Sequence, residues 1–266
     1  MPQGGRHDHG CCKIDDHCMI IMGGINTDGI LSSGMIYDAR TELWTPLLND
    51  MPETLRNFGI AGNDKYVFVS GGMPACYEYS NTVYRLSLET FEWRIMAPMG
   101  TNRCRFAAVR KGDYIYVFGG SGSRLVERYS IIDNAWEPLP DMERGRCDHR
   151  AVVGSGDDIY IVGGVGTDDT FEIFDTASFL WESGRIPRNI PKRRNNAAAV
   201  VLKDQYLVMI SGWDEGEDAT AECLIYDIWS KHWSVTPSSI DMLTPRDNYF
   251  TAAVLDGKIV VAGGLN

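Results

Sequence analysis

The sequence predicts an all-β protein built from repeated units, and three observations carry that prediction. An arginine recurs six times, each followed 15 to 17 residues later by the end of a short apolar strand. These arginines are spaced 43 to 52 residues apart, and no stretch shows the i, i+3, i+4, i+7 apolar spacing of a packed helix. A fixed period with constant internal positions indicates a repeat architecture. The six are Arg6, Arg56, Arg103, Arg146, Arg194 and Arg246.

The apolar strands end in pairs of small residues, usually two glycines. Glycine at such a position allows close approach of another segment of backbone. In the fifth unit Trp213 replaces the second glycine. The glycines are Gly23 and Gly24, Gly71 and Gly72, Gly119 and Gly120, Gly163 and Gly164, Gly212, and Gly263 and Gly264.

A second half of each unit contains an aromatic residue, a short polar turn and a tryptophan. The polar turn predicts a hairpin between two further strands. The aromatic residue precedes the tryptophan by seven residues, or by nine in the second unit. The aromatic residues are Tyr37, Tyr84, Tyr129, Phe174 and Tyr226. The tryptophans are Trp44, Trp93, Trp136, Trp181 and Trp233.

This order of arginine, apolar strand, double glycine, tyrosine and tryptophan resembles the kelch repeat, and the resemblance covers nearly the whole chain. It implies a single domain over residues 1–266: a six-unit kelch β-propeller of four-stranded blades around a central channel, with strands a to d in each blade. The aromatic residues and tryptophans are then expected to pack blade against blade. The expected repeats cover approximately residues 6–55, 56–102, 103–145, 146–193, 194–245 and, in part, 246–266.

The last unit is expected to form an incomplete blade. It carries strand a (NYFTAAVL) and strand b (KIVVAGG) but no tyrosine or tryptophan. The opening MPQGGR resembles the inter-blade segments DMPETLR and DMERGR, so it is not expected to donate the missing strands. Two interpretations remain. Either the chain is a fragment of a longer propeller protein, which we favour, or the sixth blade is two-stranded with an exposed edge.

Composition and charge narrow the classes of function. A formal net charge of −11 argues against general nucleic-acid binding, which depends on Lys and Arg neutralising phosphates. No apolar run approaches the roughly 20 residues needed to cross a membrane. Seven scattered cysteines without a paired framework, and no Asn-x-Ser/Thr acceptor, favour a reducing compartment, the cytoplasm or the nucleus. No cofactor is expected.

Six potential metal ligands crowd the N-terminal segment, and zinc sites are built from such residues. Their spacing matches no closed zinc motif, and the repeat offers a simpler interpretation. Alignment of RHDHGCC with RCDHRAV places two of the cysteines on inner strand a, where small buried thiols pack as hydrophobic groups. Core packing is therefore favoured over a metal site. The residues are His7, His9, Cys11, Cys12, His17 and Cys18.

The repeated arginines are the main candidates for partner binding. In an antiparallel blade the b–c loops and the d–a loops emerge on one face, and each arginine opens strand a. We therefore expect the six arginines, with Arg105, to ring the channel mouth on that face. The resemblance implies that such arginines clamp acidic peptides. The alternative is structural, with the guanidinium groups bonding loop carbonyls or acidic groups. Trp213 and Tyr77, in b–c loops, are further candidate contacts.

The predicted function is a non-enzymatic protein-interaction module that binds a protein or acidic peptide on the b–c/d–a face. The resemblance implies the substrate-recognition part of a ubiquitin ligase adaptor. An actin-binding or scaffold-binding propeller is the alternative. A small-molecule enzyme, an oxidase or a sugar isomerase, is less favoured because no catalytic motif or convergent set of metal-binding histidines appears.

Overall fold

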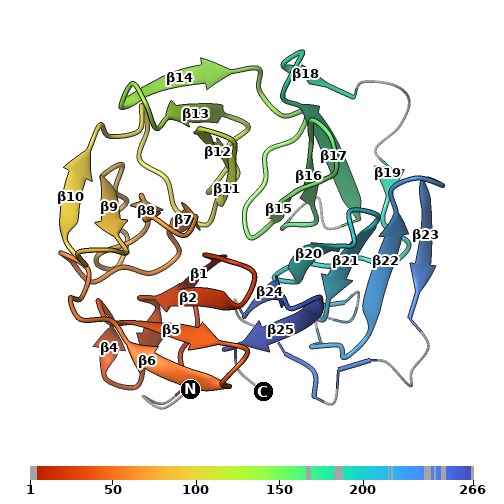
Figure 1. Ribbon diagram of the computed structural model, residues 1–266. Coiled ribbons are helices and arrows are strands. Elements are labelled where there is room, and N and C mark those ends of the chain that lie inside the picture. Colours follow the sequence, from red (N-terminus) through yellow and green to blue (C-terminus); the bar gives the residue numbers. More distant parts are fainter. Residues whose placement is uncertain are drawn as a thin grey trace.

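The chain folds into a β-propeller of antiparallel sheets arranged around a central axis, seen in the computed structural model (Figure 1). The described parts of the chain contain strands and turns and no helix. None of their segments could therefore cross a bilayer as an apolar helix. The structure describes residues 5–165, 169–182, 188–214, 216, 218–236, 241–242, 244–246 and 250–264, with backbone only at 188–189.

The first three blades each contain four strands, ordered a to d from the axis outward. Blade 1 is formed by β1 (Gly10–Lys13), β2 (Cys18–Met22), β5 (Gly34–Asp38) and β6 (Leu43–Pro46). Its b–c loop carries the small hairpin of β3 (Ile25–Asn26) and β4 (Gly29–Ile30). Blade 2 is formed by β7 (Gly59–Gly62), β8 (Tyr66–Ser70), β9 (Val83–Ser87) and β10 (Trp93–Met96). Blade 3 is formed by β11 (Ala107–Lys111), β12 (Tyr114–Phe118), β13 (Val126–Ser130) and β14 (Ala135–Leu139).

The next two blades repeat this order, with one addition. Blade 4 is formed by β15 (Arg150–Val153), β16 (Asp158–Val162), β17 (Thr170–Asp175) and β18 (Leu180–Trp181). The short strand β19 (Arg188–Asn189) also pairs with β17. Blade 5 is formed by β20 (Ala198–Leu202), β21 (Tyr206–Ile210), β22 (Cys223–Asp227) and β23 (His232–Val235).

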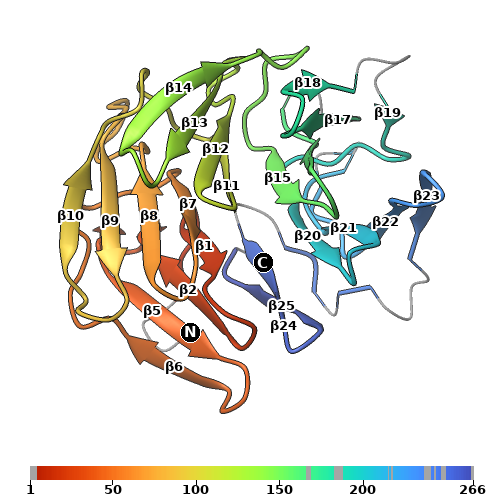
Figure 2. The same cartoon turned by 45° about the horizontal axis from the view of Figure 1, so that its top comes forward.

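The last unit forms a two-stranded sheet of β24 (Thr251–Leu255) and β25 (Lys258–Ala262). The described chain thus has five blades that contain strands a to d, so the expected six units are not confirmed as six blades. The ring nevertheless closes, because β24 lies between β20 and β1 (Figures 1 and 2). Polar contacts join this hairpin to blade 1: the Asp256 amide donates to the Asp16 carbonyl at 2.9 Å, and His17 Nδ1 lies 2.5 Å from the Asp256 carboxylate.

The hydrophobic core is divided among the interfaces between neighbouring sheets. One cluster of buried side chains fills each interface, including the two on either side of the β24–β25 hairpin. Between blades 2 and 3, for example, the cluster includes Phe68, Phe106 and Tyr129. Because each blade buries both faces only against its neighbours, the sheets depend on one another for stability.

The aromatic residues of strand c and the tryptophans of strand d lie opposite each other in four of the five blades. In blade 3, Tyr129 faces Trp136 with ring centroids 5.1 Å apart. The Trp136 indole N–H donates to the Ala97 carbonyl of the preceding blade at 2.8 Å. Each such pair therefore joins strands c and d and can also tie one blade to the previous one. The other pairs are Tyr37–Trp44, Phe174–Trp181 and Tyr226–Trp233.

Blade 2 departs from this pattern in a way that explains its nine-residue spacing. Trp93 lies opposite Leu86, so a leucine occupies the position that the sequence pattern assigned to Tyr84. Tyr84 sits two residues earlier along β9, and its hydroxyl donates to Glu53 at 2.9 Å. The assignment of Tyr84 to the repeated aromatic position was therefore wrong by two residues.

Candidate partner-binding face

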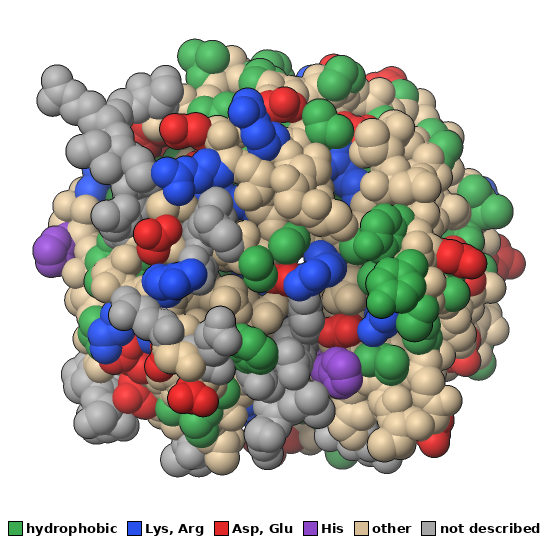
Figure 3. Space-filling view, turned by 180° about the vertical axis from the view of Figure 1, so that it is seen from behind, with side chains coloured by type: hydrophobic (Ala, Val, Ile, Leu, Met, Phe, Trp, Pro, Cys, Tyr) green, Lys and Arg blue, Asp and Glu red, His purple; other side chains and the backbone are tan. Residues whose placement is uncertain are grey.

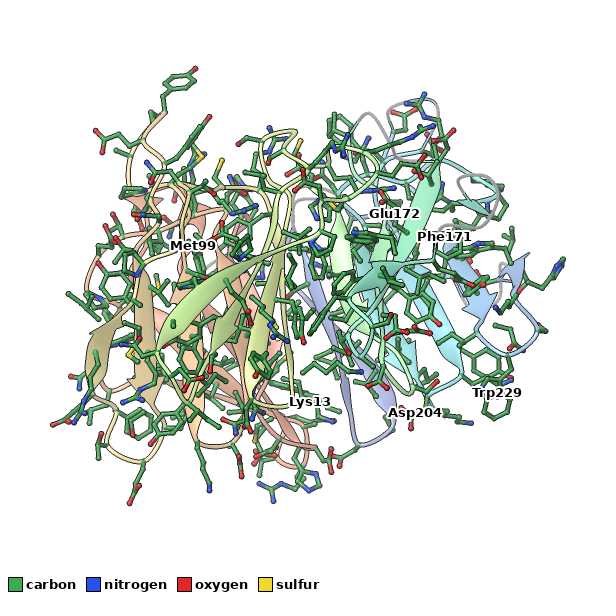
Figure 4. The ribbon with its side chains drawn as sticks, turned by 90° about the horizontal axis from the view of Figure 1, so that it is seen from above. Lys13, Met99, Phe171, Glu172, Asp204 and Trp229 are labelled. Carbon is green, nitrogen blue, oxygen red and sulfur yellow. The ribbon has the colours of Figure 1, made fainter. Side chains whose placement is uncertain are left out.

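The b–c and d–a loops emerge on one face of the propeller, which we call the loop face. Figure 3 views this face and shows basic, acidic and apolar side chains around a central depression. Figure 4 shows the molecule edge-on, with Met99 of a d–a loop toward the loop face. Lys13 and Asp204, both beside a–b turns, lie toward the opposite face, which we call the turn face.

Four of the repeated arginines lie inside the blades and not on the surface of the loop face. Arg6, Arg103, Arg146 and Arg194 are all buried. Each of the first three donates from Nη1 to the carbonyl of the glycine that ends strand b of the same unit, at 2.7 to 3.1 Å. Their side chains therefore hold the glycine turn against the start of strand a, which is the structural alternative weighed above.

A carboxylate on strand c, or just before it, completes the site of three of these arginines. Arg103 Nη2 lies 2.6 Å from Glu127, and Arg194 Nη2 lies 2.6 Å from Glu222. Arg146 meets Glu172 in the same way, at 2.9 Å. Burial lowers the pKa of Arg146, and Glu172 opposes that effect. These bonds satisfy donors that would be costly to bury alone.

The second unit places its arginine one position away from the others. The Leu55 carbonyl accepts from the Gly24 amide, just as the Arg103 carbonyl accepts from the Gly72 amide. Leu55 is buried and occupies the repeated arginine position. Arg56 follows it, and its side chain extends to Asp8 at 3.6 Å. The sequence register of Arg56 was therefore wrong by one residue, and its side chain is half-buried, with 21% of its surface exposed.

Arg246 retains the structural contact of its unit. Its Nη1 donates to the Gly263 carbonyl at 2.6 Å, and its own carbonyl accepts from the Ser211 hydroxyl at 2.9 Å. Arg246 is half-buried.

A ring of residues with left-handed backbone borders the channel on the loop face. Three backbone hydrogen bonds link neighbouring members: Asn57 N to Asp8 O, Arg105 N to Asn57 O, and Asp148 N to Arg105 O, at 2.9 to 3.0 Å. Asn and Asp tolerate a positive φ better than most residues, which suits four of the five positions. The members are Asp8, Asn57, Arg105, Asp148 and Asn196, with φ between 52° and 58°.

Arg105 is the member of this ring that combines a strained backbone with an accessible charge. Its Nε donates to Asp148 Oδ1 at 2.8 Å, and its Nη2 contacts the other carboxylate oxygen. Asp148 is fully buried, whereas the Arg105 side chain is 39% exposed. The carboxylate thus orients a guanidinium group whose remaining surface faces the channel mouth. Among the predicted arginines, Arg105 presents an accessible guanidinium group, whereas the side chain of Arg56 is 21% exposed.

Exposed apolar side chains accompany these cations. Tyr77, at the tip of the b–c loop of blade 2, is 89% exposed and has a φ of 61°. A bulky residue in the left-handed region is uncommon, and such strain often marks a functional loop. Tyr79 lies on the same loop, and Leu125 and Val165 lie on the b–c loops of blades 3 and 4; all three are exposed.

Three exposed basic residues on this face lie outside the six repeated arginine positions: Arg124, Arg144 and Arg193. They occupy variable loop positions, so no repeated pattern singles them out. Arg144 and Arg193 each precede a buried arginine by one or two positions, and Arg124 follows the glycine pair of blade 3. Their only signal in the sequence was basic charge in a predicted loop.

Trp213 is half-buried, so it is less accessible than an exposed anchor would be. Its backbone bridges Asn195 and Ala219 at the base of the b–c loop of blade 5. Its indole nitrogen is buried without a hydrogen-bond partner among the described atoms. The Trp213 backbone therefore anchors the base of this loop.

A central cavity of about 650 Å³ runs along the inner strands between the two faces. Two buried histidines, His9 and His149, line it near the loop face. Burial, reinforced by nearby arginines, lowers the pKa of each to about 3, so both are neutral at physiological pH. They occupy the position held by Phe58 and Phe106 in blades 2 and 3 and pack in the same way against a glycine. Arg150, which begins strand a of blade 4, extends to the last unit, where its Nη2 donates to the Phe250 carbonyl at 3.2 Å.

The N-terminal histidines and cysteines are dispersed by the strands that carry them. Cys11 and Cys12 lie on β1 and Cys18 begins β2, as the repeat alignment predicted. His9 Nε2 lies 3.3 Å from the Thr251 hydroxyl, whereas His17 meets Asp256 at the opposite end of the blade. Burial raises the pKa of the Cys11 thiol to about 11. Across the described residues, no three His, Cys, Asp or Glu side chains converge as metal ligands.

Comparison with known proteins agrees with the blade pattern. A family model described as the KLHDC2/KLHL20/DRC7 Kelch-repeats domain matches residues 103–264, and the Kelch motif matches residues 54–100. The chain belongs to the kelch-repeat family. The buried arginine and the glycine pair are thus elements of a kelch blade.

Curated relatives are longer proteins. The chain is 28% identical to mouse Kelch-like protein 36 over 67% of its own length and 31% of that protein. It is 25% identical to human Kelch-like protein 38 over 95% of its length and 43% of that protein. It is 30% identical to the cowpox virus Kelch repeat and BTB domain-containing protein 2 over 49% of its length and 24% of that protein. The chain therefore spans less than half of the length of each.

Proposed function

We propose that this kelch propeller is a non-enzymatic protein-interaction module that binds an acidic segment of a partner on its loop face. The observation that carries the proposal is the gathering of accessible cations and an exposed aromatic side chain on one face of a chain with net charge −11. Opposite charge raises the association rate and orients a partner. An exposed tyrosine supplies the apolar contact that typically dominates binding energy.

The buried and the exposed arginines have different parts in this proposal. Buried Arg103 and Arg146 hold the loops in place through the glycine carbonyls. Arg105, whose side chain is 39% exposed, and the less accessible Arg56, at 21%, offer donors to a carboxylate of the partner. Because Asp148 already fixes the Arg105 guanidinium, little side-chain entropy remains to be lost on binding.

A role as the substrate-recognition part of a ubiquitin ligase adaptor is the finer proposal. It is supported by the resemblance of the chain to Kelch-like proteins and to a protein whose name pairs kelch repeats with a BTB domain. Such a role requires the propeller only to select a partner, which the loop face is suited to do. We propose a cytoplasmic or nuclear site of action, in keeping with seven free cysteines.

The test is a binding selection from a library of acidic peptides, followed by affinity measurement. A Tyr77→Ala/Arg56→Ala/Arg105→Ala variant should lose at least about tenfold in affinity, as expected when an aromatic anchor and charged hydrogen bonds are removed. Arg94→Ala is the matched control, since Arg94 is exposed on outer strand β10, away from the loop face. Binding should also weaken as salt rises. Equal affinity of the triple variant and the control would contradict the proposed face.

A further inference from the structure

A pocket of about 390 Å³ lies between blades 4 and 5 on the side of the turn face. Figure 4 places Trp229, which belongs to the same c–d turn as the pocket residue Lys231, at the edge opposite Met99. The pocket is therefore separate from the loop face. Its lining combines carboxylates with aromatic rings: Asp158, Asp175, Glu182, Tyr160, Trp181 and Tyr226.

An arginine occupies the corresponding place between blades 3 and 4. The Arg128 guanidinium lies 4.3 Å from the centre of the Tyr114 ring and 4.4 Å from that of Phe179, which belongs to the next blade. It also pairs with Glu137 on β14. Blade 2 holds Arg85 at the same register position, 4.5 Å over the Tyr66 ring. This inter-blade position thus accommodates a stacked guanidinium group.

Strand register shows that blade 4 carries isoleucine where blades 2 and 3 carry this arginine; blades 1 and 5 also carry isoleucine there, Ile36 and Ile225. Tyr160 faces Ile173 across β16 and β17, just as Tyr116 faces Arg128 across β12 and β13. Ile173 therefore stands where Arg128 stands. Glu182 lies beside Ile173 as Glu137 lies beside Arg128, because the Glu182 amide donates to the Ile173 carbonyl.

Two further differences change the charge of the blade 4 pocket. Asp158 faces Asp175 at the position where Tyr114 faces Ser130, so two carboxylates replace a ring and a hydroxyl. Lys231, two residues before Trp233, takes the place of Phe179. Its Nζ lies 3.3 Å from Glu182, but both side chains are exposed. Exposed ion pairs of this kind contribute little stabilisation, so a bound cation could displace Lys231 from Glu182.

The electrostatics of the pocket favour an added cation. Burial, followed by the charges of Glu182 and Asp175, raises the pKa of Asp158. These carboxylates repel one another, and a guanidinium group between them would relieve that repulsion. Within the described part of the chain no set of carboxylates is arranged as metal ligands, whereas the aromatic walls suit a planar organic cation.

We propose that this pocket binds the guanidinium group of an arginine side chain presented by a partner peptide, in the place that Arg128 fills in blade 3. The Glu182 and Asp158 carboxylates would accept its hydrogen bonds, and the aromatic walls would stack on its plane. The site is independent of the acidic-peptide face, because the two lie on opposite sides of the propeller and require opposite charge.

The experiment compares two peptides, acetyl-Gly-Arg-Gly-amide and its citrulline counterpart, which has the same shape without the charge. Wild-type protein should bind the arginine peptide and should bind the citrulline peptide at least about tenfold more weakly. Calorimetry measures affinity, and the fluorescence of Trp181, isolated by comparison with a Trp181→Phe variant, reports occupancy. Free methylguanidinium should compete with the arginine peptide if the side chain alone is recognised.

Two variants separate the pocket from general attraction to an acidic protein. Ile173→Arg introduces at this position the internal cation seen in blade 3 and should abolish peptide binding. Asp158→Asn/Glu182→Gln keeps the shape of the pocket and should weaken binding at least about tenfold, so the test does not depend on the folding of the arginine variant. Circular dichroism verifies folding of both. Equal affinity for the two peptides, undiminished binding by the asparagine/glutamine variant, or no binding by the wild type at millimolar peptide would each overturn the proposal.

Discussion

Arg103 and Glu127 form a buried ion pair inside blade 3, with Nη2 and Oε1 2.6 Å apart. The same guanidinium group donates to the carbonyls of Gly119 and Leu125. A single side chain therefore joins the d–a loop, the end of strand b and the start of strand c. Arg103, which the sequence suggests as a partner contact, is therefore a structural element of the blade.

Removing one partner of this pair should destabilise the propeller strongly. Arg103→Leu leaves Glu127 without its cation, and we expect the free energy of unfolding to fall by about 3–5 kcal/mol. Blade 2 carries Leu55 and Tyr84 at these two positions. The double variant Arg103→Leu/Glu127→Tyr should therefore lose less stability than the single one. Urea unfolding followed by circular dichroism measures both, and a double variant less stable than Arg103→Leu would show that blade 2 is not a valid template.

Buried histidines should make the propeller sensitive to acid. His149 has a pKa of about 3 when folded, because of burial and then of Arg146 and Arg150, against about 6.5 when unfolded. Between these two pKa values, His149 is therefore protonated in the unfolded chain and neutral in the folded chain. Above pH 6.5, protonation of His149 does not affect stability. As pH falls from 6.5 toward 3, the free energy of unfolding decreases by up to about 1.4 kcal/mol per pH unit.

Replacing this histidine tests the prediction. His149→Phe copies Phe106 at the same position and cannot be protonated, so its urea midpoint should fall less between pH 7 and pH 5 than that of the wild type. His17→Phe is the control for a partly exposed histidine at the turn face. Parallel pH profiles for wild type and His149→Phe would show that this site does not titrate on unfolding.

Alanine at the end of strand b should be much more costly than alanine in an open turn. Gly163 and Gly156 have nearly equal positive φ values of 66° and 69°. A Cβ on Gly163 would lie 2.5 Å from the Arg194 carbonyl oxygen, whereas none of the described atoms lies within 4 Å of one on Gly156. Gly156→Ala should cost about 1–2 kcal/mol from backbone strain, and Gly163→Ala clearly more. Thermal unfolding of the two variants compares them directly.

One thiol should react rapidly with a thiol reagent in the native protein. Cys76, on the b–c loop of blade 2, is exposed. Burial raises the pKa of the other six, including Cys104 and Cys147, which suppresses the reactive thiolate. Ellman's reagent should therefore modify about one thiol per native chain quickly, and Cys76→Ser should remove that phase. A fast phase that survives in Cys76→Ser would reveal opening of a blade.

Local pattern allowed the fold to be predicted because each landmark recurs at the same position in successive blades. Period-two strands, glycine turns and the aromatic–tryptophan pair recur in the register that neighbouring strands need. Blade 2 is the exception: Leu55 and Leu86 occupy the arginine and aromatic positions, so pattern matching selected Arg56 and Tyr84 nearby. A repeated residue type identifies a position only when the neighbouring register agrees.

The sequence by itself determined the repeat, its strands and the family to which the chain belongs. The tertiary structure alone decided which charges are accessible, because burial depends on contacts between strands a, b and c that are distant in the sequence. Arg146 is buried, enclosed by Gly163 and Glu172, whereas Arg105 is partly exposed and is held at the channel mouth by Asp148. The acidic pocket beside Ile173, the blade 4 counterpart of Arg128, is likewise recognised only when the blades are compared in register, since its lining comes from strands of two blades.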